Sequence, residues 1–136
     1  MATRKQYNVV ICGGGLAGLT LSLQLRKLYP SAAVTVIEKT TRPLPEAAHK
    51  VGESTVEIGG HYFAEVLGLK TYLQKKQFPK LGLRYFYGDT SQPFENRAEL
   101  GPSMFSPVPT YQLDRGTFES DLREMAITSG VNLLEG

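Results

Sequence analysis

A glycine-rich stretch between two short apolar runs constrains this chain more than any other feature. Gly13, Gly15 and Gly18 have the spacing G-x-G-x-x-G and directly follow the apolar run at residues 8–12. A long segment with helical periodicity comes next, and the β-branched run at residues 34–37 then leads to Glu38. The order of these features predicts a strand, a tight loop, a helix and a second strand, joined as a parallel βαβ unit.

Each glycine of the motif has a mechanical reason. Gly13 lets the chain turn out of the strand, Gly15 lacks a Cβ and lets the backbone approach a pyrophosphate, and Gly18 lets the helix pack against the strand. The helix N-terminus then directs free N–H groups and the positive end of its dipole at the phosphates. We therefore expect the loop and the first helical turn to bind a dinucleotide. These residues are Gly13, Gly14, Gly15, Leu16, Ala17 and Gly18.

Glu38 limits which dinucleotide can bind. It lies about 20 residues past the last glycine, where a carboxylate can accept hydrogen bonds from the adenosine ribose hydroxyls. A carboxylate there would repel a 2′-phosphate. FAD and NAD both remain open at this point, because both present an adenosine diphosphate to the same loop.

Composition argues against several other classes of protein. A net charge of +2 with scattered Lys and Arg residues does not indicate nucleic acid or a membrane surface as a partner. No stretch approaches the ~18 apolar residues of a transmembrane helix, and no convincing signal peptide precedes the glycines, so we expect a cytoplasmic protein. Cys12 is the only cysteine, which excludes an internal disulfide and a metal-thiolate cluster, and no metal site is expected.

The periodicity also predicts how the remaining elements are arranged. The β-branched strand at residues 34–37 is typical of a strand covered on both faces, and the wide apolar surface of the preceding helix indicates burial on more than one side. A helix over residues 117–129 leads to a strand at residues 131–134 that extends the parallel sheet. The chain stops just after that strand begins, so we expect an incomplete domain that is inactive in isolation.

Residues 40–112 form an excursion that is too long for a simple crossover. Ser54-x-x-Glu57 is a capping box and predicts a helix from Thr55 to Gly68. Apolar and polar residues alternate over residues 81–88, which predicts a strand. Its aromatic side chains either line a cavity or pack within a sheet. Residues 94–109 contain no predicted element, and residues 111–113 predict a short return strand. We expect residues 1–136 to be an N-terminal FAD-binding domain, with residues 40–112 directed toward a substrate domain.

Three segments together resemble the FAD-binding proteins of the aromatic hydroxylase type. They are residues 9–18, residues 36–39 including Glu38 and Lys39, and residues 112–115 followed by Phe118, Leu122 and Ala126. The resemblance implies an α/β, Rossmann-like fold with FAD as the cofactor and Lys39 beside it. It also implies that Arg115, at the start of the last helix, approaches the cofactor. The alternative is an arginine in solvent at a helix N-terminus.

Within that superfamily, the sequence V-G-E-S-T-V at residues 51–56 resembles the G-E-S-x-x-P signature of the flavin-dependent halogenases, the tryptophan-halogenase-like group. Glu57 stands where that signature has proline. The resemblance implies that Gly52, Glu53 and Ser54 lie near the flavin. It further implies that Lys80, just ahead of a strand, is the catalytic residue that steers hypohalous acid toward the substrate. A solvated lysine cluster with Lys75 and Lys76 is the alternative.

The resemblance therefore implies a FAD-dependent oxidoreductase, a halogenase that acts on a small aromatic or pyrrolic substrate and uses a separate flavin reductase. A FAD-dependent aromatic hydroxylase or monooxygenase that uses NAD(P)H is the alternative within the superfamily. An NAD-dependent dehydrogenase and a non-catalytic nucleotide-binding module are the alternatives outside it.

Overall fold

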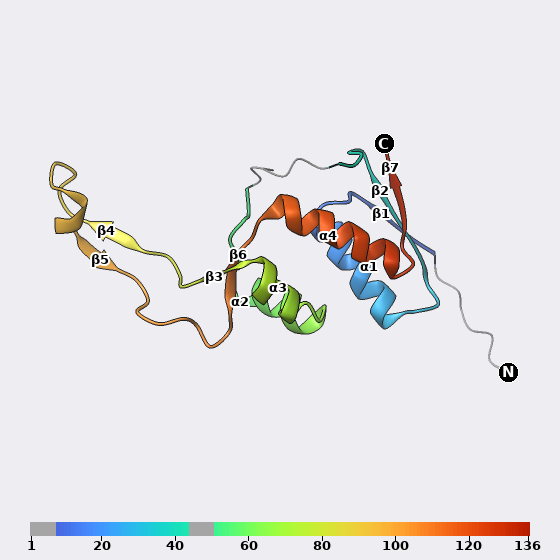
Figure 1. Ribbon diagram of the computed structural model, residues 1–136, viewed down its shortest axis with the longest axis horizontal. Helices are drawn as coiled ribbons and strands as arrows, with labels where there is room; N and C mark the ends of the chain where they lie inside the picture. Colours follow the sequence, from blue (N-terminus) through green and yellow to red (C-terminus); the bar gives the residue numbers. More distant parts are fainter. Residues whose placement is uncertain (1–7, 44–50) are drawn as a thin grey trace.

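The predicted βαβ unit is present in the computed structural model, which describes residues 8–43 and 51–136. Strand β1 (Asn8–Cys12), helix α1 (Leu16–Leu28) and strand β2 (Ala33–Glu38) follow one another, and the two strands pair in parallel. Strand β7 (Asn132–Glu135) pairs in parallel with the other edge of β2, so the sheet order is β1-β2-β7 (Figure 1). The α/β fold with a parallel sheet is thus confirmed.

The other elements belong to the excursion and to the helix that returns from it. In chain order they are α2 (Glu57–His61), the π-helix η1 (Tyr62–Val66), α3 (Lys70–Lys76), β3 (Phe78–Lys80), β4 (Tyr85–Tyr87), the 3₁₀ helix η2 (Phe94–Asn96), β5 (Ala98–Leu100), β6 (Thr110–Gln112) and α4 (Arg115–Thr128). No helix in the described ranges is long and apolar enough to cross a membrane.

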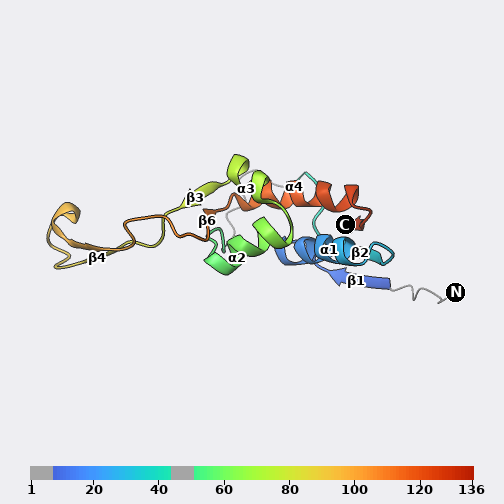
Figure 2. The ribbon, with the colours of Figure 1, turned by 90° about the horizontal axis from the view of Figure 1, so that it is seen from below.

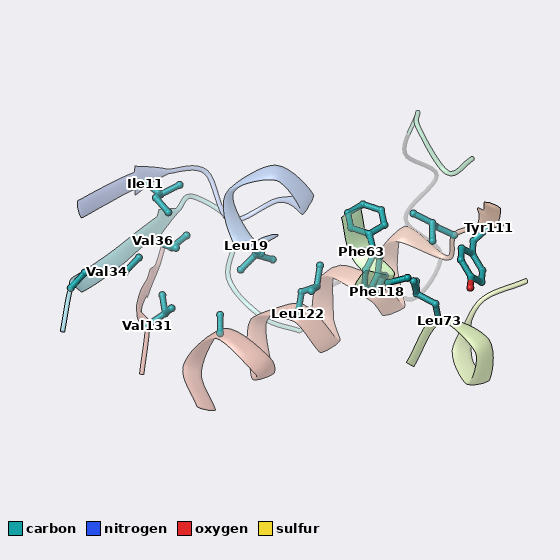
Figure 3. Close-up of a cluster of buried hydrophobic side chains, with 14 residues drawn as sticks. Ile11, Leu19, Val34, Val36, Phe63, Leu73, Tyr111, Phe118, Leu122 and Val131 are labelled. Carbon is teal, nitrogen blue, oxygen red and sulfur yellow. The ribbon is translucent and has the colours of Figure 1, made fainter. Parts of the chain in front are cut away.

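The core lies between the parallel sheet, α1, α4 and the helices of the excursion (Figure 3). Helices α1 and α4 contact each other, and Leu19 and Leu122 are fully buried between them and the sheet. Phe118 continues this core into the excursion. Its ring lies edge to face with Phe63 and stacks on Tyr72, with ring centroids 5.5 Å and 5.4 Å apart. The excursion is therefore packed against the βαβ unit through α4.

The opposite face of the sheet is uncovered within the described residues, which corrects the expectation that β2 is covered on both faces. Val10, Ile37 and Leu134 are 61%, 45% and 49% exposed, whereas Val34 and Val36 on the other face are buried. The expectation of a helix α1 buried on more than one side is confirmed, because α1 contacts both the sheet and α4, and its Gln24 accepts a hydrogen bond from the Tyr62 hydroxyl of η1 at 2.9 Å. Both crossovers place their helices on one face, because successive crossovers of the same hand that step in one direction along a sheet lie on the same side.

A small antiparallel ribbon joins the excursion to the start of α4. Strand β3 pairs with β6, and Ser54 forms an isolated bridge with Gln112 on the other edge of β6. The Thr55 N–H donates to the Tyr111 carbonyl at 2.9 Å, and the Leu113 N–H donates to the Glu53 carbonyl at 2.5 Å. The predicted return strand is confirmed as β6, one residue earlier than expected.

The predicted capping box is not formed. Helix α2 begins at Glu57 with Val56 as its N-cap, and no side chain caps it. Ser54 is held in the ribbon instead, two residues before the helix cap, so its hydroxyl cannot reach the first helical turn. The predicted end of the helical segment is confirmed, because Gly68 follows η1 with a φ of +77°, the left-handed conformation typical after a helix.

Strands β4 and β5 form a hairpin arm that extends away from the rest of the molecule in both views (Figures 1 and 2). The strand predicted over residues 81–88 is limited to residues 85–87, because Gly82 and Gly88 have φ values of +142° and +141° that interrupt extended pairing. Its partner β5 lies in the segment for which no element was predicted. Its three residues are too few to give a clear alternating pattern.

Helix α4 provides a test of the local physics. Asp114 is its N-cap, and its carboxylate accepts from the Thr117 N–H at 3.0 Å, which lowers the pKa of Asp114 below its ordinary value of 3.8. We expect Asp114→Ala to reduce the free energy of unfolding at pH 7 by about 1 kcal/mol, measured by urea denaturation. Asp114→Asn, whose amide oxygen still caps the helix, is the control and should lose only a small part of that.

The contribution of Asp114 to the free energy of unfolding should depend on pH in a defined direction. A lowered pKa in the folded state means that the carboxylate stabilises the fold above pH 3.8 and that this stabilisation is lost as the pH falls through the folded-state pKa. The difference between wild type and Asp114→Ala should therefore shrink below pH 3.8. Equal stability of the two proteins at pH 7 would contradict the capping role.

Candidate active site

The glycine loop is shaped by contacts that only glycine permits. Gly13 has a φ of +114°, and its N–H donates to the Ile37 carbonyl at 2.7 Å, which ties the loop to β2. A Cβ on Gly18 would overlap the carbonyl oxygen of Gly13, and the Ile11 side chain lies beside it. Helix α1 therefore approaches β1 more closely than any side chain at position 18 would allow.

Glu38 is fixed at the carboxyl end of β2. One oxygen, Oε2, accepts from the Gly14 N–H at 2.6 Å, and the other, Oε1, accepts from the Thr40 N–H at 2.9 Å. Partial burial alone would raise the pKa of Glu38, but the hydrogen bonds from Thr40 and Gly14 outweigh it and lower the pKa below 4.5. Glu38 is thus an oriented, ionised acceptor beside the glycine loop.

Gly15 differs from its neighbours because no contact within the described residues requires a glycine there. Its φ of −85° is open to any residue, and a Cβ built on it meets no atom within 4 Å. Helix α1 begins immediately after it, with no side-chain cap and no acidic residue in its first turn. An open approach to an uncompensated positive helix end fits a diphosphate. Leu16 is half-buried there, while Ala17 and, across the loop, Lys39 are exposed.

Arg115 holds the loop at Gly52 from the first turn of α4. Its Nη1 lies 3.3 Å from both the Val51 and the Gly52 carbonyl oxygens, and its guanidinium pairs with the fully buried Glu119 one turn later. The alternative of an arginine in solvent is therefore wrong. Glu119 supplies the anion that makes a cation acceptable at the positive end of this helix. Gly52 itself has a φ of +91°.

Lys80 is the last residue of β3 and reaches across the ribbon to the segment that follows Gly52. Its Nζ donates to Ser54 Oγ at 2.8 Å and to the Thr55 carbonyl, and Thr110 Oγ1 donates to the Lys80 carbonyl at 2.9 Å. Lys75 and Lys76, by contrast, are exposed on α3. Lys80 is consequently a positioned side chain, and the alternative of a solvated cluster with Lys75 and Lys76 does not describe it.

A cleft of about 380 Å³ opens beside Lys80, between the ribbon and the base of the hairpin arm. Its walls include Val56, Glu57, Leu83, Tyr85 and Met104. The sequence left open whether the aromatic residues of this strand line a cavity or pack within a sheet; Tyr85 lines the cleft, and the Tyr85 and Tyr87 side chains are 52% and 57% exposed. The cleft places an apolar surface next to a fixed ammonium group.

The predicted site residues thus form two groups. The glycine loop, the start of α1 and Glu38 lie at the carboxyl ends of β1 and β2, and the 52–54 segment, Lys80 and Arg115 lie around the ribbon. Within the described ranges, no cluster of His, Cys, Asp and Glu residues is suited to a metal ion.

Sequence reasoning missed a buried ionic network that supports the loop after Glu38. Arg123 is 2% exposed, and its Nη1 donates to Glu135 Oε1 at 2.7 Å and to the Thr40 carbonyl at 3.3 Å. Arg42 pairs with the same Glu135 at 2.9 Å. Helical spacing could have revealed this network, because positions 119 and 123 share the face of α4 that carries Leu122 and Ala126.

Comparison with known proteins identifies the family. The family model described as "Tryptophan halogenase" matches residues 8–99, and the chain belongs to this family. The flavin-dependent halogenase chlA of Dictyostelium discoideum is 31% identical over 137 residues, which cover 96% of this chain and 23% of that protein. The 1H-pyrrole-2-carbonyl-[peptidyl-carrier protein] brominase of Pseudoalteromonas luteoviolacea is 30% identical over 139 residues, which cover 100% of this chain and 30% of that protein.

The fold agrees with that assignment. The crystal structure of halogenase PltM in complex with phloroglucinol and FAD superposes with a TM-score of 0.69 at 20% identity, over 95% of this chain and 27% of that chain. The chain therefore spans between about a fifth and a third of the length of the relatives that it matches. The predicted resemblance to flavin-dependent halogenases is confirmed, and so is the expectation of a partial domain.

Two glycines of the loop provide a test of this geometry by stability alone. We expect Gly18→Ala to lower the free energy of unfolding by about 2–3 kcal/mol, because its Cβ would overlap the Gly13 carbonyl. Gly15→Ala should cost about 1 kcal/mol or less, since its Cβ enters open space. Both values come from urea denaturation. A similar cost for the two variants would show that α1 does not approach β1 as described.

Proposed function

We propose that this chain is the FAD-binding part of a flavin-dependent halogenase that acts on a small aromatic or pyrrolic substrate. The observation that carries the proposal is the position of Lys80, which is fixed on Ser54 of the G-E-S segment and faces the cleft. In the family that this chain belongs to, the names of relatives include a flavin-dependent halogenase and a pyrrole brominase.

The glycine loop is suited to the adenosine diphosphate half of FAD. We assign the diphosphate to the N–H groups at the start of α1, reached through the open space above Gly15, and the ribose hydroxyls to Glu38. Lys39 is exposed next to Glu38 and adds a positive charge near the phosphates. The 52–54 segment, held by Arg115, then contacts the flavin end of the cofactor.

Lys80 is the catalytic residue of this proposal. When bound, the reduced flavin together with dioxygen as the oxidant would supply the chemistry that converts halide to hypohalous acid, with oxidised flavin and water as the other products. An ammonium group has three donors, and Ser54 Oγ and the Thr55 carbonyl occupy two of them. The third donates a hydrogen bond to hypohalous acid and polarises its halogen toward an electron-rich ring in the cleft.

The partners follow from the same proposal. The substrate is a small aromatic or pyrrolic compound, as the names of the pyrrole brominase and of the PltM complex with phloroglucinol suggest for those relatives. A separate flavin reductase supplies reduced flavin. An enzyme of this kind would not consume NADPH by itself, which separates it from an aromatic hydroxylase.

Cofactor binding tests the first half of the proposal. In the enzyme that carries this chain, Gly15→Ala should weaken FAD binding at least tenfold, because a Cβ would occupy the space through which the diphosphate approaches. Flavin fluorescence titration measures the affinity. Gly59→Ala is the matched control, since a Cβ there makes only an ordinary 3.8 Å contact with Thr55, and its affinity should equal that of the wild type. Unchanged FAD affinity in Gly15→Ala would exclude this diphosphate site.

Turnover tests the second half. Lys80→Met should lower the halogenation rate by about a hundredfold or more while FAD still binds, because the donor to hypohalous acid is lost. The control is Lys76→Met, which changes an exposed lysine of α3 and should halogenate normally. Product formation is followed by mass spectrometry. Normal halogenation by Lys80→Met would remove Lys80 from the mechanism.

A further inference from the structure

Glu57 is the only carboxylate among the residues that line the cleft beside Lys80. The lining residues are Val56, Glu57, Lys80, Leu81, Gly82, Leu83, Tyr85, Gly101, Pro102, Met104, Ser106 and Thr110. All of them belong to the described part of the chain, and Lys80 is the only other charged residue in the set. A ligand in this cleft therefore meets one fixed donor and one acidic acceptor.

The Glu57 carboxylate is available to a ligand. It forms no hydrogen bond or ion pair within residues 8–43 and 51–136, and no cap closes back over the start of α2. The sequence pattern that predicted a capping box had paired Ser54 with Glu57. In the structure Ser54 accepts from Lys80, and Glu57 lines the cleft without a partner among the described residues.

Most of the remaining lining of the cleft is apolar. Leu83, Tyr85 and Met104 contribute side chains from the hairpin arm. The two segments at the base of that arm lie close together. A Cβ on Gly82 would lie only 2.5 Å from Pro102 Cγ. An apolar wall with few polar groups is the usual design of a site for a small ring compound, in which the polar groups fix the orientation.

We propose that Glu57 is a specificity-determining residue that accepts a hydrogen bond from an O–H or N–H group of the substrate ring, an inference that rests on the proposed function of the cleft. A carboxylate accepts but does not donate, and its hydrogen bonds are stronger than those of neutral acceptors. The cleft thus selects rings that carry a donor. Proline, which the halogenase signature has at this position, offers no such acceptor.

Pairs of probes that differ only in the donor test this selection. Phenol is compared with anisole, and pyrrole with N-methylpyrrole, by ¹H–¹⁵N chemical-shift titration of the 136-residue chain without flavin or halide. In the wild type, the member with the donor should bind about tenfold more tightly, with shifts at Val56, Leu83 and Tyr85. A preference for phenol alone assigns the selection to O–H donors, and a preference for pyrrole alone assigns it to N–H donors.

Variants then attribute the preference to Glu57. Glu57→Ala should abolish it, and Glu57→Gln, whose amide oxygen still accepts, should retain part of it and guards against a folding defect in the alanine variant. Glu65→Gln, on η1 and outside the cleft, is the control and should keep the full preference. A tenfold preference that survives in Glu57→Ala would overturn the proposal, as would shifts confined to residues outside the cleft.

This experiment is independent of the proposed function. It contains no cofactor, so a chain that fails to bind FAD still reports whether Glu57 selects for a donor. Conversely, loss of the donor preference in Glu57→Ala with normal FAD binding and halogenation would leave the halogenase proposal intact.

Discussion

The close approach of α1 to β1 at Gly18 is the constraint on which the nucleotide-binding half of the molecule depends. Because residue 18 has no Cβ, α1 can start beside the Gly13 carbonyl. Its N-cap is Gly15, on which a Cβ would meet no atom of the described residues within 4 Å. The same turn brings the Gly14 N–H to Glu38, whose Cβ would lie 2.7 Å from a Cβ on Gly14. The positive helix end and the Glu38 carboxylate are thus set by one backbone geometry, and the Arg123 network holds Thr40 in the loop that follows Glu38.

The second half of the site depends on a different interaction, the pairing of residues 53–55 with β6. That ribbon carries Ser54 to Lys80 and places the Gly52 loop against Arg115 at the start of α4. Helix α4 carries Phe118 into the core, and α1 bonds to η1 through Gln24 and Lys27, so both helices join the excursion to the parallel sheet.

Strong local patterns were predictable from the sequence, and features that depend on distant partners were not. The glycine spacing and the β-branched run of β2 each act within a few residues, and each predicted the right element. The Ser54-Glu57 capping box failed because residues 53–55 pair with the distant strand β6, which holds Ser54 two residues before the cap of α2. The sheet face with Val10 and Ile37 was expected to be covered but is exposed. This prediction was wrong because a β-branched composition does not say whether one face or both faces of a strand are packed. The cleft required two segments to cross at Gly82 and Pro102, which no local pattern encodes.

The central claim is that the loop, the start of α1 and Glu38 form a site for an adenosine diphosphate group. Titration of the ¹⁵N-labelled chain with ADP, followed by ¹H–¹⁵N spectra, tests it most directly, because weak binding is sufficient and no flavin is needed. We expect the largest shifts at the amides of Gly15, Leu16 and Ala17, with Thr40 responding through Glu38. Shifts that fall elsewhere on the chain, with these amides unchanged at saturating ADP, would contradict the account.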